Sequence, residues 1–315
     1  MKKAYSLKEV IVVIVILGLA SITLTNSLRQ IYLNLFITKE ISTLQNTSVK
    51  VLNQIENYMK RGVKESFVRY NGDRTIALQR IDSNNYTPIR NLTNGDLING
   101  DILLWIDKDI ENLTYGDWNV DYIKPYYNKW FNIETSNNRN FISIDSQFTK
   151  LIDNQKEMFN TNLVPSVHFI YANKIGTPFN RFWNLNPQSL FPIEMDTTHG
   201  TEPLTDNAMF LTRQPLEIGE LYDISYTAYG IRYDAPTKEL RLIYNFQPWE
   251  TNGGVQETFD DGSEKIILKN VSQFNFWIEN NLLRLEICVQ SEQLIVDEVD
   301  DTSTELCKER TLEVL

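Results

Sequence analysis

The chain has 315 residues and a formal net charge of −11 at pH 7. This length fits one large or two small globular lobes. Direct binding to the backbone of DNA or RNA needs clustered Lys and Arg, and no such cluster stands out among 30 basic and 41 acidic residues. Composition therefore argues against a direct nucleic-acid partner.

The N-terminal residues contain an apolar segment long enough to cross a bilayer. Lys2 and Lys3 come first, and a nearly unbroken apolar stretch runs from residue 10 to about residue 28. About 19 apolar residues suffice to span the hydrocarbon layer, and basic residues before such a segment favour a cytoplasmic N terminus. Glu9 stands at the entrance of the stretch, where a carboxylate is costly and needs a specific reason.

The residues around Glu9 follow a specific order. They are Lys2-Lys3-Ala4, then Tyr5-Ser6-Leu7-Lys8-Glu9, then the apolar run Val10-Ile11-Val12-Val13-Ile14-Val15-Ile16-Leu17-Gly18. This order resembles the class III signal and N-terminal helix of type IV pilins and pseudopilins. Members of that family have a short basic leader, an aromatic first residue in the mature chain, a Glu at its fifth position and an apolar helix. The match covers about the first thirty residues, and it departs from the usual pattern at Ala4 (usually Gly), Lys8 (usually apolar) and Asn26 (often Pro).

The resemblance implies that a prepilin peptidase cuts between Ala4 and Tyr5 and that the new amine of Tyr5 is methylated. It also implies a filament in which Glu9 of one subunit lies near the Tyr5 amine of a neighbour. Such pairing would offset the desolvation of both charges and fix the axial register of the subunits. Without a filament, Glu9 would lie in the headgroup region beside Lys8. The apolar segment also has two plainer interpretations: a secretory signal cut near Ala20, or an uncleaved signal anchor.

A helical pattern continues beyond the apolar segment. Apolar residues recur at spacings of three and four from Ile31 to Met59, with polar residues on much of the opposite side. The pattern predicts one helix over residues 5–61, with about 8–28 embedded in the membrane and the rest packed on a globular domain. Gly62 is the predicted C-cap. The alternative is two helices joined near Ser27.

Residues 62–315 have the pattern of an exported β-rich domain. Four antiparallel hairpins are predicted around the turns 71–73, 99–100, 234–237 and 279–281, with their arginines on the solvent face. Val271, Phe274 and Phe276 resemble a pattern in the C-terminal sheet of larger minor pseudopilins. Residues from about 107 to 220 are irregular and form a possible insertion. The expected fold class is α+β, with a long N-terminal helix packed on an antiparallel sheet, as in pilins.

The two cysteines, Cys288 and Cys307, lie near the C terminus. Export would permit a disulfide, and the placement resembles the C-terminal disulfide of many pilins. The alternative is a buried strand thiol at Cys288 with Cys307 unpaired. Asp297, Asp300 and Asp301 offer oxygen ligands for calcium, which some pseudopilins bind near their C terminus, but the spacing is not that of an EF-hand. A solvated acidic loop is the other interpretation, and no cofactor is assigned.

Nothing in the sequence indicates an enzyme. His168, which is expected on a strand, and His199, which is expected in a loop, are far apart and lack metal-ligand spacing. The chain has no G-x-S-x-G motif, P-loop or Cys-x-x-Cys motif. Aromatic residues of the middle region could form a binding platform, although core filling is the plainer expectation. These residues are Tyr126, Tyr127, Trp130, Phe131, Phe179, Phe182 and Trp183.

The expected function is that of a structural subunit. The resemblance and the large size favour a minor pilin or pseudopilin of a type IV pilus, a type II secretion pseudopilus or a competence filament. The implied partners are other pilins through the N-terminal helix, the prepilin peptidase and an inner-membrane assembly platform. The implied location is the bacterial inner membrane, crossed once with a cytoplasmic N terminus and a periplasmic domain, and then the filament. The alternative is a signal-anchored exported protein that stays monomeric and binds a ligand through the aromatic middle region.

Overall fold

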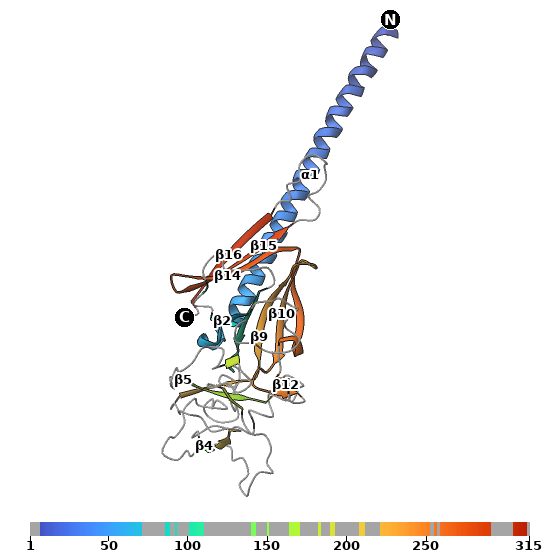
Figure 1. Cartoon of the computed structure of the whole chain (residues 1–315). Coiled ribbons are helices and arrows are strands. Elements are labelled where there is room, and N and C mark those ends of the chain that lie inside the picture. Colours follow the sequence, from blue (N-terminus) through green and yellow to red (C-terminus); the bar gives the residue numbers. More distant parts are fainter. Residues whose placement is uncertain are drawn as a thin grey trace, which may run out of the picture.

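The computed structural model describes residues 7–70, 86–88, 92, 101–109, 140–142, 150, 164–170, 182–183, 190–192, 208–211, 221–252, 255–256, 259–290 and 305–313. These residues form one long helix and several antiparallel sheets, which is an α+β arrangement. Figure 1 shows the N-terminal end of the helix projecting beyond the sheets as a bare rod. The strands β4 (Asn140–Ile142) and β5 (Ser166–Ile170) lie at the opposite end of the molecule.

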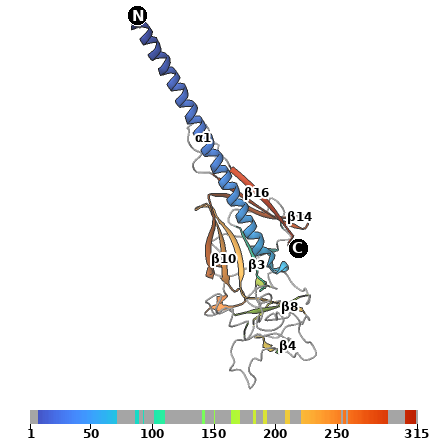
Figure 2. The ribbon, with the colours of Figure 1, turned by 180° about the vertical axis from the view of Figure 1, so that it is seen from behind.

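The helix α1 (Leu7–Lys60) is continuous over 54 residues and is about 80 Å long at 1.5 Å per residue. It contains no proline, so no side chain interrupts its backbone hydrogen bonds. Both views show it as a single rod (Figures 1 and 2). The predicted single helix is therefore confirmed from Leu7 to Lys60, and the alternative of two helices joined near Ser27 is wrong.

Gly62 follows the helix, but close packing rather than a left-handed backbone explains its presence. Its N–H donates to the carbonyl of Met59 at 2.9 Å, and its φ lies outside the left-handed range. A Cβ at this position would lie 2.6 Å from Cζ of Phe67 and 2.9 Å from Cδ1 of Trp105. Gly62 thus follows the end of the helix at the predicted position, but core rings, and not a left-handed backbone angle, exclude a side chain here.

The largest sheet has six strands in the order β13-β10-β9-β3-β1-β2, and all neighbours are antiparallel. Its strands are β1 (Val68–Tyr70), β2 (Tyr86–Pro88), β3 (Ile102–Ile106), β9 (Ala228–Asp234), β10 (Glu239–Phe246) and β13 (Ser263–Lys269). Two three-stranded sheets have the orders β14-β15-β16 and β6-β5-β8, and two ribbons pair β4 with β7 and β11 with β12. The strands of these smaller sheets that have not been defined above are β6 (Leu190–Pro192), β7 (Ala208–Phe210), β8 (Leu221–Ser225), β11 (Thr251–Asn252), β12 (Val255–Gln256), β14 (Val271–Glu279), β15 (Leu282–Gln290) and β16 (Glu305–Leu312). Two short 3₁₀ helices, η1 (Lys64–Ser66) and η5 (Phe259–Asp261), complete the described elements.

Two of the four predicted hairpins are confirmed. β9 pairs with β10, and β14 pairs with β15 through a turn in which Asn280 and Asn281 both have positive φ. Asparagine tolerates this left-handed conformation, which two-residue hairpin turns require. The other two predicted hairpins are wrong, because the strands expected to form them have other neighbours on both edges: β1 lies between β2 and β3, and β3 lies between β1 and β9. The turns at 71–73 and 99–100 themselves lie outside the described residues.

One hydrophobic core joins the C-terminal half of α1 to the six-stranded sheet and to β14–β16. At its centre the fully buried Trp105 stacks on Phe67 and on Tyr229, with ring centroids 5.8 and 5.9 Å apart. Tyr58 of α1 lies 5.3 Å from Tyr229. Each apolar side chain that is buried here contributes about 1.5–3 kcal/mol. The helix adds Val51, Leu52, Ile55 and Met59, and the small sheet adds Val271, Phe274, Phe276, Leu283, Leu285, Ile287, Val289 and Leu312.

A second core covers the other face of the six-stranded sheet and fastens the sheet β6-β5-β8 to it. Phe182 and Trp183 are buried here, and Nε1 of Trp183 donates to the carbonyl of Ser66 at 2.9 Å. The side-chain amide of Gln247 exchanges two hydrogen bonds with the backbone of Val164, at 2.9 and 3.1 Å. Strands from the possible insertion at 107–220 are therefore tied to the main sheet by buried polar contacts.

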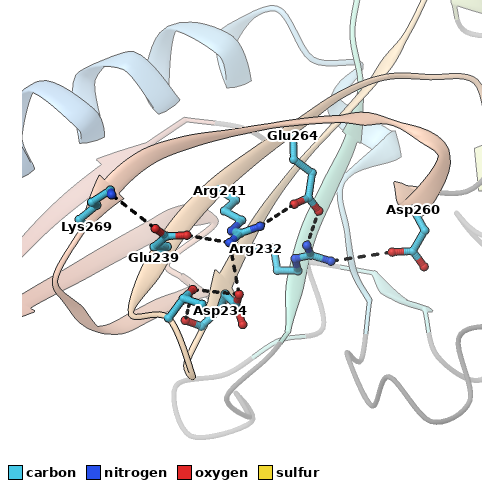
Figure 3. Close-up of polar contacts among 8 residues, drawn as sticks. Arg232, Asp234, Glu239, Arg241, Asp260, Glu264 and Lys269 are labelled. Carbon is cyan, nitrogen blue, oxygen red and sulfur yellow. Dashed lines mark hydrogen bonds and ion pairs between the residues drawn. The ribbon is translucent and has the colours of Figure 1, made fainter.

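Charged residues form a network across β9, β10 and β13 (Figure 3). Arg241 lies directly opposite Arg232, so two guanidinium groups meet across the ladder. Like charges placed opposite each other destabilise a sheet unless acids intervene. Glu264 pairs with both arginines, at 3.1 Å from Arg241, and Glu239 pairs with Arg241 at 2.7 Å. Glu264 first, then Glu239, raises the pKa of Arg241 above its ordinary value. Asp234, Asp260 and Lys269 complete the network.

The prediction that the hairpin arginines lie on the solvent face is wrong for Arg232, which is only 8% exposed. Its charge is instead balanced by Glu264 and by Asp260, which lies 3.8 Å away in η5. A period-two pattern identifies the face of a strand that a residue occupies, but it does not show whether another element covers that face.

Candidate membrane-spanning and assembly helix

The N-terminal half of α1 is apolar and uncovered. From Leu7 to Tyr32 its large apolar side chains are between 46% and 78% exposed. An 18-residue window of the helix has a mean hydropathy of 2.4, and by length and composition this is the one helix among the described residues that could cross a membrane. A soluble domain does not normally leave such a surface in water.

Charged residues bracket this uncovered segment. No Asp, Glu, Lys or Arg occurs between Glu9 and Arg29. The 19 residues between them are about 28 Å long at 1.5 Å per residue, which matches a hydrocarbon layer of about 30 Å. The predicted membrane segment at about 8–28 therefore coincides with an uncharged and exposed stretch of the helix.

Glu9 lies in the first turn of α1 and is exposed. An acid at this position interacts favourably with the positive end of the helix dipole. Ala4 and Tyr5, the predicted cleavage and methylation positions, lie outside the described residues. The pairing of Glu9 with a neighbouring Tyr5 amine therefore stays a prediction.

The C-terminal half of α1 is held by charge as well as by the core. The carboxylate of Glu56 accepts hydrogen bonds from Lys60 and from Arg310 of β16, both at 2.7 Å. Lys60 first, then Arg310, lowers the pKa of Glu56 below its ordinary value of 4.5. At the end of the helix, Arg61 pairs with the buried carboxylate of Asp107 at 3.0 Å. The exposed half of α1 is thus a continuation of a firmly docked helix.

The structure contains the disulfide between Cys288 and Cys307, so the alternative of a lone buried thiol is wrong. The two residues are direct partners in the ladder of β15 and β16, and the bond therefore fastens the last described strand. Glu286 lies close to both sulfur atoms, but sulfurs in a disulfide cannot act as thiolate ligands, so this group of three does not form a metal site. The possible calcium ligands Asp297, Asp300 and Asp301 lie outside the described residues.

The other candidate residues fall into two groups. His168 lies in β5 as predicted, is buried, and contacts the ring of Phe182, whereas His199 lies outside the described residues. Phe182 and Trp183 are core residues, which confirms the core-filling expectation for this pair. The other aromatic residues of the suggested platform, at 126, 127, 130, 131 and 179, are outside the described part of the chain.

Sequence reasoning missed the contact that holds the helix to the last strand. The pair Glu56 and Lys60 has the spacing of neighbours on a helix and could have been found. Arg310 is 254 residues away from Glu56, and no local pattern indicates that the two meet.

The described residues define an α+β protein with one long helix, half of it docked on antiparallel sheets and half of it apolar and uncovered. No family model, curated protein or solved structure matches this chain.

Proposed function

We propose that this chain is a structural subunit of the pilin and pseudopilin kind, a minor component of a type IV pilus, a type II secretion pseudopilus or a competence filament. One observation carries the proposal: a bare apolar helix with Glu9 at its entrance continues without a break into the core of a β-rich domain. An ordinary signal anchor requires the apolar segment but requires neither the acid nor the rigid connection to the domain.

Each part of the N-terminal segment has a role in this function. A prepilin peptidase cuts between Ala4 and Tyr5 and methylates the amine of Tyr5. Before assembly the helix crosses the inner membrane once and the β-rich domain lies on the periplasmic side. During assembly the exposed apolar residues pack against the helices of other subunits, and Glu9 pairs with the Tyr5 amine of a neighbour. Each charge alone in an apolar filament core would be costly.

The test is Glu9→Gln, which keeps the size and polarity of the side chain and removes its charge. Membrane insertion should be unchanged, because the apolar stretch at 10–28 is intact. Incorporation into sheared filaments should fall on the order of tenfold or more, because the amine of Tyr5 loses its partner. Lys8→Gln serves as the control, since it changes a neighbouring charge that has no role in the pairing.

A second measurement separates the proposal from the signal-anchored alternative. The N-terminal peptide from native membranes should begin at methylated Tyr5 and should do so only when the prepilin peptidase is present. An intact Met1, a cut near Ala20, or equal incorporation of the Glu9→Gln and Lys8→Gln variants would contradict the filament role. A ligand of the middle region would then be sought instead.

A further inference from the structure

Beyond the uncharged segment, one face of α1 combines apolar and basic side chains. We call this set the outer stripe; it consists of Leu28, Arg29, Ile31, Tyr32, Leu35, Phe36 and Lys39. Its five apolar members are between 47% and 70% exposed, and both basic residues are exposed. All of the stripe except Leu28 thus lies outside the 19 uncharged residues that already suffice to span a bilayer.

The outer stripe and the globular domain lie on opposite sides of the helix. A helix advances by about 100° per residue, so positions 28, 32, 35 and 39 share one side. Leu33, Ile37 and Leu44 are about half a turn away, and all three are partly covered. Leu44 packs against the main core. The domain therefore leaves the whole outer stripe accessible.

The charge of the stripe is opposite to that of the protein. The chain as a whole carries −11, but residues 28–39 contain two basic residues and no acid. The next acid, Glu40, is partly covered, on the side of the globular domain. A local basic and aromatic surface on an acidic protein indicates a negatively charged partner, such as the phosphate groups of lipids.

The length of the apolar surface also exceeds the thickness of a bilayer. From Val10 to Phe36 the helix has 27 residues and is about 40 Å long, against about 30 Å of hydrocarbon. A tilt, which reaches about 40° in membrane proteins, would bring the part of this surface beyond the 19 uncharged residues closer to the headgroup layer. A tilted helix turns one face toward the bilayer, and the face opposite the globular domain is the one that can approach it.

We propose that the outer stripe binds the headgroup layer on the side of the membrane that holds the globular domain. Arg29 and Lys39 contact the phosphates of anionic lipids, and Tyr32 and Phe36 lie at the boundary between headgroups and acyl chains, where aromatic residues are favoured. The helix then leaves the bilayer obliquely, with the globular domain directed away from the lipids. This inference rests on the membrane-inserted state in the proposed function and does not depend on filament assembly.

The experiment places a fluorescent label at Phe36→Cys or at Ile37→Cys in the full chain. The two positions are at nearly the same height, but only the first belongs to the outer stripe, whereas Ile37 lies on the side of the globular domain. The native cysteines are joined in a disulfide. Each variant is inserted into vesicles of phosphatidylcholine with phosphatidylglycerol that contain a headgroup spin label. The label at position 36 should be quenched several-fold more strongly than the label at position 37. Arg29→Gln with Lys39→Gln should remove most of this difference, whereas Lys50→Gln, further along the helix, should not.

Equal and weak quenching at both positions in a chain that resists carbonate extraction would overturn the inference and leave the membrane span intact. Shielding at position 36 that depends on protein concentration and not on the lipid quencher would show that another helix covers the stripe, and would also overturn it. Extraction of the chain by carbonate would contradict the membrane-inserted state itself, and with it both proposals.

Discussion

Glu56 is the residue through which the long helix is coupled by charge to the last strand. Its side chain is mostly covered, and its partners Lys60 and Arg310 are more exposed. Because these partners lower the pKa of Glu56 below 4.5, the carboxylate stabilises the fold above the unfolded value of about 4.5. The contribution is lost as pH falls through the lower value of the folded state.

We therefore predict that Glu56→Gln lowers the free energy of unfolding of the full chain in detergent micelles by about 1 kcal/mol at neutral pH, a modest value because solvent screens both partners. The difference from the natural chain should shrink as pH falls below 4.5. Urea unfolding, monitored by tryptophan fluorescence, measures this difference in the free energy of unfolding. Arg310→Gln alone and combined with Glu56→Gln completes a double-mutant cycle; a difference that does not change with pH would contradict this assignment.

At the scale of single residues, the sequence predicts what local chemistry determines and misses what the tertiary fold determines. His168 and Cys288 were placed correctly on strands because their neighbours alternate in the pattern of a strand. Gly62 is predicted as a cap, but the nearby rings of Phe67 and Trp105 are what exclude a side chain at this position. Arg232 was assigned to the solvent face, but η5 and β13 cover it. In both cases the deciding neighbour comes from another element.

At the scale of elements, β16 is held by four kinds of interaction. Eight residue pairs join it to β15, the disulfide lies within this ladder, Leu312 enters the main core, and Arg310 pairs with Glu56 of the helix. The disulfide closes a loop between residues 19 apart. Closing a loop of this size restricts the unfolded chain and stabilises the folded state by about 3 kcal/mol.

We predict that replacing Cys288 and Cys307 together by serine lowers the free energy of unfolding by about 3 kcal/mol, and that dithiothreitol has a similar effect on the natural chain. Urea unfolding with and without the reductant tests this. The double variant should be insensitive to dithiothreitol, which provides the control. A natural chain equally stable in both conditions would show that β16 is held without a contribution from the disulfide.

Hairpins were the elements most readily predicted. The β14–β15 turn is marked by Asn280 and Asn281, whose side chains suit a left-handed backbone, and the flanking strands alternate regularly. The order of the strands within the six-stranded sheet could not be predicted, because β3 and β9 are neighbours although more than a hundred residues separate them. Such pairings depend on the packing of the whole core.

At the scale of the whole molecule, the structure has a membrane-length rod at one end and the sheet β6-β5-β8 near the other (Figure 1). The long helix was predictable because an apolar segment and an amphipathic segment follow each other without a proline. The attachment of the sheet β6-β5-β8, the distant sheet, could not be predicted from the sequence. It depends on hydrogen bonds from Gln247 and Trp249, which occur in an otherwise unremarkable turn after β10.

Gln247 is a buried polar link between the six-stranded sheet and the distant sheet. It is 3% exposed, and its amide bonds both backbone groups of Val164 and the carbonyl of Tyr226, the latter at 2.6 Å. Gln247→Leu keeps the apolar volume but leaves the N–H of Val164 and the carbonyl of Tyr226 without this partner. Each buried polar group that loses its hydrogen bond costs about 1–3 kcal/mol.

We therefore predict that Gln247→Leu weakens the attachment of the distant sheet by about 2–4 kcal/mol while the helix-bearing end is unaffected. Hydrogen exchange of the full chain should show faster exchange in β5 and β8 and unchanged exchange in β14–β16, because Gln247 bonds Val164, next to β5, and Tyr226, next to β8. Trp249→Phe removes a single bond to the carbonyl of Val164, which Gln247 still satisfies, and should produce a smaller effect in the same strands. Equal acceleration in all sheets would mean that the molecule unfolds as one cooperative unit, and that Gln247 supports the whole fold rather than the link between its two ends.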